Sequence, residues 1–165
     1  MFFFELKEHV VDFFTNPVLL CAIFSWFLAQ IIKVFTSPKY RKGLDFFRFA
    51  FGSGGMPSSH SAVVTATCFS CGILYGYDSA IFAVSAVLAI VVMRDASGIR
   101  REASKHAEVI NDISQELAKK HKKFSEITLS EFLGHTLSQV IMGALLGVVM
   151  AFICQLLIFP VMLPA

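Results

Sequence analysis

The chain has 165 residues, of which 56% are hydrophobic, and its mean hydropathy is +0.69. A soluble domain of this size is less apolar, so the composition indicates a small membrane protein with several spans. The net charge is only +2 at pH 7, which gives no sign of nucleic-acid binding, and we expect no nucleic-acid partner.

The N-terminal segment MFFFELKEHVVDFF carries acidic residues at Glu5, Glu8 and Asp12, where a signal peptide has basic ones. Its Phe and Val residues recur at helical spacing. The segment therefore predicts an amphipathic helix that lies at the membrane interface ahead of the first span.

Four apolar runs are candidate membrane spans, because a helix needs about 20 apolar residues to cross a bilayer. They cover residues 13–32, 49–77, 79–93 and 132 to the C-terminus. The third run is short, but it continues weakly to residue 98, and its flanking charges can reach the interface. Four cysteines lie inside these runs, and we expect them to pack as small apolar residues without forming disulfides.

Two polar segments, Lys33 to Arg48 and Arg94 to Glu131, hold 13 of the 14 Lys and Arg residues. They follow the first and third spans, so they lie on the same side of the membrane. The positive-inside rule places that side in the cytoplasm, with both termini outside. The end of span one, the start of span two, the end of span three and the start of span four then meet at this face.

Residues 99–123 predict a helix that projects from span three. One face carries charges in helical register, at Arg101, Lys105, Glu108 and Asp112. Another is apolar and consists of Val109, Ile110, Ile113 and Leu117. The basic cluster KKHKK at 119–123 favours a solvated surface near anionic lipid headgroups.

The sequence GGMPSSH at residues 54–60 stands where a charged loop meets the second span. Glycines let backbone amides point inward, Pro57 suits the first turn of a helix, and a helix N-terminus attracts anions. Ser58 and Ser59 can cap the helix and donate to a phosphate oxygen. His60 lies one turn inside and is placed to hand over a proton, so the segment predicts a phosphate site with its own acid.

His135 opens the last span, and Gln139 follows one helical turn later. Gly143 and Gly147 follow at the same four-residue spacing and lie on the same helix face. Small residues there favour close packing against a neighbouring helix. Close packing brings His135 near His60. Two histidines with nearby cations form a reasonable set for phosphoryl transfer.

Charged residues at the other two span ends are further candidates. Lys33 closes span one and either reaches the interface or contacts phosphate. Asp95 ends an apolar run and needs a partner, which is a histidine, an arginine or a metal, although no spacing specifies a metal site. Arg100 and Arg101 follow it, and one of them at least suits a membrane anchor.

Two motifs match a known superfamily. Pro57-Ser58-Ser59-His60 resembles the PSGH motif of the type 2 phosphatidic acid phosphatase and vanadium haloperoxidase superfamily. The run from Gly134-His135 to GALLG at 143–147 resembles its last motif. The order GGMPSSHSA, DASGIRREASKHAEVIN, FLGHT is similar to the divergent bacterial and plastid branch of that superfamily, over about residues 17–155.

The resemblance implies roles for these residues. His135 would be the nucleophile that forms a phosphohistidine, and His60 would protonate the leaving group. Ser58 matches the motif serine, and Ser59 replaces its glycine. Two positions depart from the superfamily pattern, because Leu129 stands where an arginine is usual and Gln139 stands where an acidic residue orients the nucleophile.

The first motif of the superfamily is not cleanly present. Lys33 is the best match for its lysine, and Arg100 and Arg101 are substitutes for the missing arginines. Together with Ser58 and Ser59, these three residues form the expected phosphate-binding set. Asp95 and Gln139 are expected to support it.

We therefore predict an all-α integral membrane helix bundle, with about four transmembrane helices, an N-terminal interfacial helix and a cytoplasmic helical extension. Residues 1–165 form one membrane-embedded domain. The expected function is hydrolysis of a lipid phosphomonoester or diphosphate through a phosphohistidine, without metal or cofactor. The expected partners are the lipid substrate and membrane lipids, with a homodimer as a further option.

The implied location is a bacterial inner membrane or a plastid membrane, with the site facing the cytoplasm or stroma. One alternative is a phospholipid-binding or scaffold protein that has lost turnover, which Gln139 and Leu129 favour. A second alternative is a small transporter or channel subunit. The polar residues cluster at one membrane face and mark no pathway, which argues against transport.

Overall fold

The computed structural model describes residues 10–36, 55–120, 129 and 134–160. Within these ranges the regular elements are all helical, which confirms the predicted all-α class. The elements are α2 (Pro17–Thr36), α4 (Ser59–Tyr75), α5 (Ala80–Ser97), α6 (Ile99–Lys120), α7 (Leu137–Ile153) and the π-helical turn η2 (Cys154–Ile158). The predicted 37–48 loop, most of the KKHKK cluster and the first nine residues lie outside the described residues.

Helix α2 begins later than the apolar run that predicts it. The side chain of Asn16 accepts hydrogen bonds from the backbone N–H groups of Val18 and Leu19, both at 3.0 Å, and Pro17 follows as the first helical residue. Such a cap followed by proline is a strong start signal. Residues 10–15 form a separate short helical segment with exposed Val and Phe side chains, which is the described end of the predicted interfacial helix.

Helix α4 also starts later than predicted. Ser58 is its N-cap, since the Ser58 hydroxyl accepts from the backbone N–H of Ser61 at 3.3 Å. The prediction that Pro57 occupies the first helical turn is wrong, because Pro57 precedes the cap and follows a cis peptide bond from Met56. His60 is consequently in the first turn of α4, not one turn inside.

Among the described residues, three helical stretches are long and apolar enough to cross a membrane: α2, α5 with its continuation α6, and α7 with η2. Helix α4 has 17 residues and is about 25 Å long, at the lower end of the range for a span. It packs against α2, α5 and α7, so it is the central helix of the bundle. The protein is an integral membrane helix bundle in which α4 corresponds to the second predicted span.

The glycine stripe on α7 allows this packing. A Cβ atom on Gly143 would overlap the backbone oxygen of Ser58, and one on Gly147 would overlap that of Ala62. The two glycines therefore let α7 approach α4 to backbone contact, as the sequence predicts. Below them a core of Cys21, Ala66, Met150, Ala151 and Cys154 joins α2, α4 and α7. All four cysteines are buried and free.

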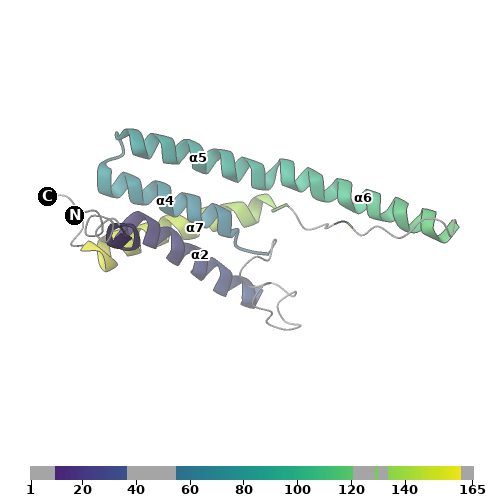
Figure 1. Cartoon of the computed structure of the whole chain (residues 1–165), viewed down its shortest axis with the longest axis horizontal. Helices are drawn as coiled ribbons and strands as arrows, with labels where there is room; N and C mark the ends of the chain where they lie inside the picture. The colour runs from purple at the N-terminus through teal and green to yellow at the C-terminus, as the bar shows by residue number, and fades with distance from the viewer. Residues whose placement is uncertain (1–9, 37–54, 121–128, 130–133, 161–165) are drawn as a thin grey trace.

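Helix α6 is the predicted extension of the third span. Gly98 separates α5 from α6, yet the two helices form one long rod that reaches well beyond the other helices (Figure 1). The four apolar residues expected on one face, Val109, Ile110, Ile113 and Leu117, are all exposed. Of the predicted charged face, Lys105 pairs with Glu102 at 2.7 Å.

Candidate active site

Four helix ends meet at one end of the bundle. Helices α2 and α5 finish there, and α4 and α7 begin there (Figure 1). Three hydrogen bonds join them: Lys33 Nζ to Ser59 Oγ at 2.9 Å, Ser58 N–H to the Gln139 carbonyl at 2.9 Å, and His135 N–H to the Ala96 carbonyl at 3.0 Å. The alternating directions of the spans predict this convergence.

The first turn of α4 offers backbone donors. Ser58 donates its N–H to α7, and the N–H of Ser61 is satisfied by the Ser58 hydroxyl. The N–H groups of Ser59 and His60 have no hydrogen-bond partner among the described residues. Free amides at a helix N-terminus favour an anion.

Lys33 is buried beside this helix start. Its side chain is only 1% exposed, and its Nζ atom contacts the hydroxyl of Ser59. No carboxylate lies within ion-pair distance of it in the part of the chain that the structure describes. A buried ammonium without a counter-charge is costly, so the position favours an anionic ligand.

His135 lies against the same helix start. It is 5% exposed, and its Nδ1 atom is buried without a hydrogen-bond partner among the described residues. The ring centroids of His135 and His60 are 6.2 Å apart, with an angle of 53° between the rings. His60 is the more exposed of the two. Both imidazoles are close enough to act on one bound phosphoryl group.

The protonation of His135 suits a nucleophile. His135 precedes α7, and burial, followed by the positive charge of Lys33, lowers its pKa from 6.5 to about 4. The imidazole is therefore neutral at pH 7 and keeps a lone pair for attack.

Gln139 makes a different contact from the one that the resemblance implies. Its side-chain oxygen accepts from the backbone N–H of Thr136 at 3.0 Å, and the Thr136 hydroxyl accepts from the N–H of Gln139. These bonds form a capping box at the start of α7. Gln139 thus fixes the turn that carries His135, while its backbone carbonyl holds Ser58.

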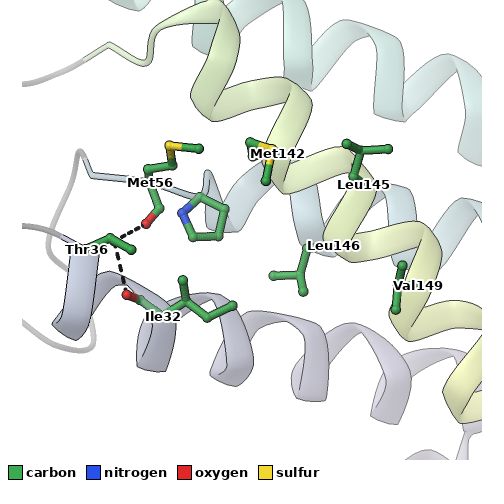
Figure 2. Close-up of a pocket in the computed structure, with 8 residues that line it drawn as sticks. Ile32, Thr36, Met56, Met142, Leu145, Leu146 and Val149 are labelled. Carbon is green, nitrogen blue, oxygen red and sulfur yellow. Dashed lines mark hydrogen bonds between the residues drawn. The ribbon is translucent and has the colours of Figure 1, made fainter.

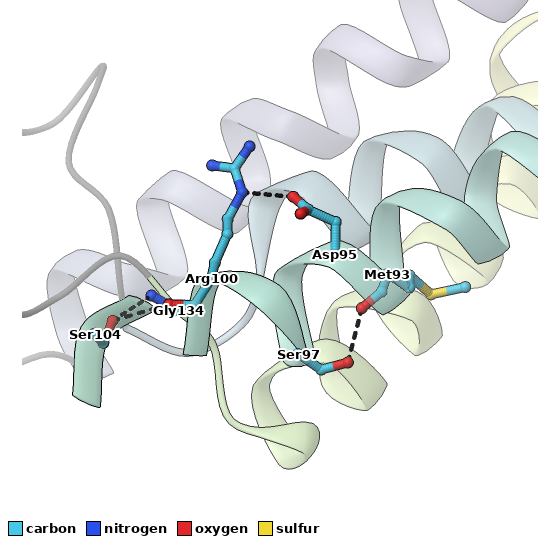
Figure 3. A network of polar contacts seen from close by, with 6 residues as sticks. All are labelled: Met93, Asp95, Ser97, Arg100, Ser104 and Gly134. Carbon is cyan, nitrogen blue, oxygen red and sulfur yellow. Dashed lines mark hydrogen bonds and ion pairs between the residues drawn. The ribbon is translucent and has the colours of Figure 1, made fainter. Parts of the chain in front are cut away.

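Asp95 and Arg100 form an ion pair at the end of α5, with Arg100 Nε 2.6 Å from a carboxylate oxygen of Asp95 (Figure 3). Both side chains are partly exposed, so the arginine can turn toward an anion near His135. Arg101 does not join the cluster. It is exposed, and its backbone packs against Gly134, where a Cβ atom would overlap it.

Two residues that the sequence reading missed hold the segment before His135. The hydroxyl of Ser104 accepts from the N–H of Gly134 at 2.9 Å (Figure 3). The side chain of Asn111 donates to the Leu129 carbonyl at 3.0 Å and accepts from the Leu129 N–H at 2.8 Å. Leu129 is the position of the usual arginine, and here its backbone is fixed to α6.

A signal for these contacts exists in the sequence. Ser104, Ala107 and Asn111 are small or amide residues at helical spacing, and Ala107 and Asn111 are the buried residues of α6. They form a third face of α6 between the charged and apolar faces. Among the described residues, no three His, Cys, Asp or Glu side chains gather into a metal-binding group.

Comparison with known proteins identifies the family of the chain. Residues 14–150 match a family described as the divergent PAP2 family. The chain is 35% identical over 153 residues to the uncharacterized membrane protein YuiD of Bacillus subtilis (strain 168), an alignment that covers 87% of this chain and 96% of that protein. No solved structure matches the chain. The matched range includes every candidate site residue, and the chain belongs to the divergent PAP2 family.

Proposed function

We propose that the protein is a membrane phosphatase that hydrolyses a lipid phosphomonoester or diphosphate through a phosphohistidine intermediate. The phosphate binds beside Lys33, Ser59 and the free N–H groups that begin α4, with Arg100 closing from α5. The depth of Lys33 within a spanning helix favours a lipid whose headgroup reaches the site while its chains stay in the bilayer.

The reaction has two steps. A neutral nitrogen of His135 attacks phosphorus, the bond from phosphorus to the lipid oxygen breaks, and His60 gives a proton to that oxygen. Water then attacks the phosphohistidine and passes a proton to His60. Inorganic phosphate leaves, and both histidines return to their starting state. Lys33 and the α4 amides stabilise charge on the phosphoryl oxygens.

The observation that carries this proposal is that two buried side chains at one place lack an interaction partner. Lys33 is 1% exposed and lacks a counter-ion among the described residues, and the buried Nδ1 of His135 lacks a partner there. A phosphate group supplies the missing negative charge and accepts hydrogen bonds from Lys33 Nζ and from the first N–H groups of α4. An ordinary structural site satisfies such groups within the protein.

The test is phosphate release by the purified protein from phosphatidate, phosphatidylglycerophosphate and polyprenyl diphosphate. We expect release from at least one lipid, and loss of it in His135→Ala and His60→Ala. His106→Ala is the matched control, because His106 is an exposed histidine on α6. Failure of all three lipids, or full activity in His135→Ala, contradicts the proposal.

A second candidate is a lipid-phosphate-binding protein without turnover. The observation that favours it is the missing support behind His135, since Gln139 is engaged in the helix cap and no carboxylate among the described residues orients the ring. Binding of a lipid phosphate without phosphate release distinguishes this candidate from the enzyme. For either candidate, we propose that the site faces the cytoplasm or stroma, from the distribution of Lys and Arg.

A further inference from the structure

An apolar groove lies between α2 and α7 (Figure 2). Its volume is about 320 Å³. Ile32 and Thr36 line it from α2, Met56 and Pro57 from the segment before α4, and Leu145 and Val149 from α7. The polar atom of Thr36 is turned away, because its hydroxyl lies within hydrogen-bond distance of the Ile32 and Met56 carbonyls. The groove therefore presents an apolar surface.

The groove is open at the site end and closed at the other. Helices α2 and α7 are joined far from the site, where Cys21 Sγ lies 3.6 Å from the Met150 carbonyl and Gln155 donates to the Pro17 carbonyl at 3.1 Å. From there the two helices diverge toward the site (Figure 2). The lining residues of α7 extend from Met142 to Val149, a length of about 10 Å along the helix.

Two residues that line the groove are sequence neighbours of residues at the candidate site. Ile32 directly precedes Lys33, and Pro57 directly precedes Ser58, the cap of α4. The groove lies between α2 and α7, two helices that are long and apolar enough to cross a membrane, so lipid chains can reach it. A molecule that fills it has an apolar chain in the groove and a charged end at Lys33.

We infer that this groove binds the part of one hydrocarbon chain nearest the headgroup of the lipid phosphate substrate. The inference rests on the proposed phosphate site and narrows the substrate class. One chain beside the phosphate is sufficient, and any second chain stays in the bilayer. Single-chain alkyl or prenyl phosphates are then substrates, while water-soluble phosphate esters lack the contact that draws them to the site.

The first experiment does not need turnover. The purified protein is photolabelled with a single-chain alkyl phosphonate that carries a diazirine near its headgroup, and the labelled peptides are identified by mass spectrometry. We expect labels on 142–149 and 32–36, and much weaker labelling with the alcohol of the same chain, which lacks the charged anchor. Labels spread evenly over the lipid-facing helices overturn the inference.

A matched pair of variants sharpens this test. Leu145 lines the groove and is 54% exposed, while Leu88 is 52% exposed and lines a separate cavity among α2, α4 and α5. Leu145→Trp should reduce labelling about tenfold by filling the groove, and Leu88→Trp should leave it unchanged. Equal labelling in wild type and Leu145→Trp overturns the inference.

Turnover adds a second readout. Leu145→Trp should raise KM for the single-chain phosphate by about tenfold, and Leu88→Trp should leave that KM unchanged. A protein that releases no phosphate from any substrate sinks the proposed function, while the photolabelling pattern still decides whether the groove binds the chain. Phosphate release that is equally efficient from phenyl phosphate and from the single-chain lipid contradicts the role of the groove in binding the chain. The proposed phosphatase function would still stand.

Discussion

Lys33 combines an ionisable ammonium group with almost complete burial, and its Nζ atom contacts the hydroxyl of Ser59. A protein that needed only stability would place an apolar residue there, because desolvating an ammonium costs several kcal/mol. The arrangement is typical of a site where function is kept at the expense of stability. The neighbouring His135 shows the same pattern, with a buried ring nitrogen that lacks a partner among the described residues.

Replacing Lys33 with methionine separates its contribution to activity from its cost in stability. Lys33→Met keeps the side-chain volume and removes the charge, so we expect kcat/KM for phosphate release to fall about 100-fold. The melting temperature should be unchanged or higher, since no buried charge remains. Lys105→Met is the control, because Lys105 is exposed in an ion pair with Glu102, and it should alter neither quantity. A lower melting temperature with unchanged kcat/KM in Lys33→Met would contradict the role.

The acid limb of the pH profile reports on His135. Burial and the nearby charge of Lys33 lower its pKa to about 4, so the ring stays neutral as pH falls through 6.5 and gains a proton only near pH 4. Activity should therefore persist to more acidic pH than an ordinary histidine allows. Histidine-selective NMR of the free protein measures the same value, with His135→Asn for assignment. A titration midpoint at 6.5 disagrees with the burial described here.

At the scale of helices, hydrophobic pattern and charge locate the spans, but capping decides where they begin. The apolar runs at 13–32 and 49–77 begin before α2 and α4, because Asn16 and Ser58 turn the chain into the helix only at those points. Thr136 and Gln139 have the spacing of a capping box, so this contact could be read from the sequence. The pairing of Asn111 with Leu129 joins residues 18 apart, and local pattern does not specify it.

Gly143 tests whether the approach of α7 to α4 positions the site. Gly143→Ala places a Cβ atom against the backbone of Ser58, which cannot shift as a side-chain end can. We expect separation of the two helices, a lower melting temperature and loss of phosphate release. Ala144→Ser also adds one heavy atom at the next position and should be tolerated. Thermal unfolding in detergent compares the melting temperatures of the two variants. Equal melting temperatures would argue against close packing of α7 on α4.

Asn111 tests the role of α6 as a support. Asn111→Ala leaves the Leu129 backbone without two hydrogen bonds, at a cost of about 2 kcal/mol. We expect kcat to fall with little change in KM, because His135 loses its position while Lys33 and α4 stay in place. Asp112→Ala at the adjacent exposed residue is the control. Steady-state kinetics measure both, and a change in KM alone would mean that α6 contacts the substrate.

At the scale of the whole molecule, the alternating direction of the spans explains why one end of the bundle gathers the candidate residues. Sequence reasoning reached this arrangement for Lys33, Ser58, Ser59, His60 and His135, because each stands at a span end. It did not separate Arg100 from Arg101. The turn at Gly98 directs Arg100 toward Asp95, while the Arg101 backbone packs against Gly134, and no periodicity reveals this difference.

The orientation that we propose from the distribution of Lys and Arg can be tested directly. Single cysteines introduced in residues 36–45 should react with a membrane-impermeant thiol reagent only after the cells are permeabilised. The native cysteines are buried, so the unmodified chain serves as the background. Labelling from outside intact cells would reverse the orientation and leave the proposed chemistry unchanged.

The central claim is that His135 carries the phosphoryl group during turnover. The direct measurement is to incubate the purified protein with lipid phosphate labelled in phosphorus, quench in base and locate the bound phosphate by mass spectrometry. We predict an acid-labile, base-stable phosphate on His135 that is absent in His135→Ala and unaffected in His106→Ala. Phosphate release without any modified histidine, or with the phosphate on another residue, contradicts the claim.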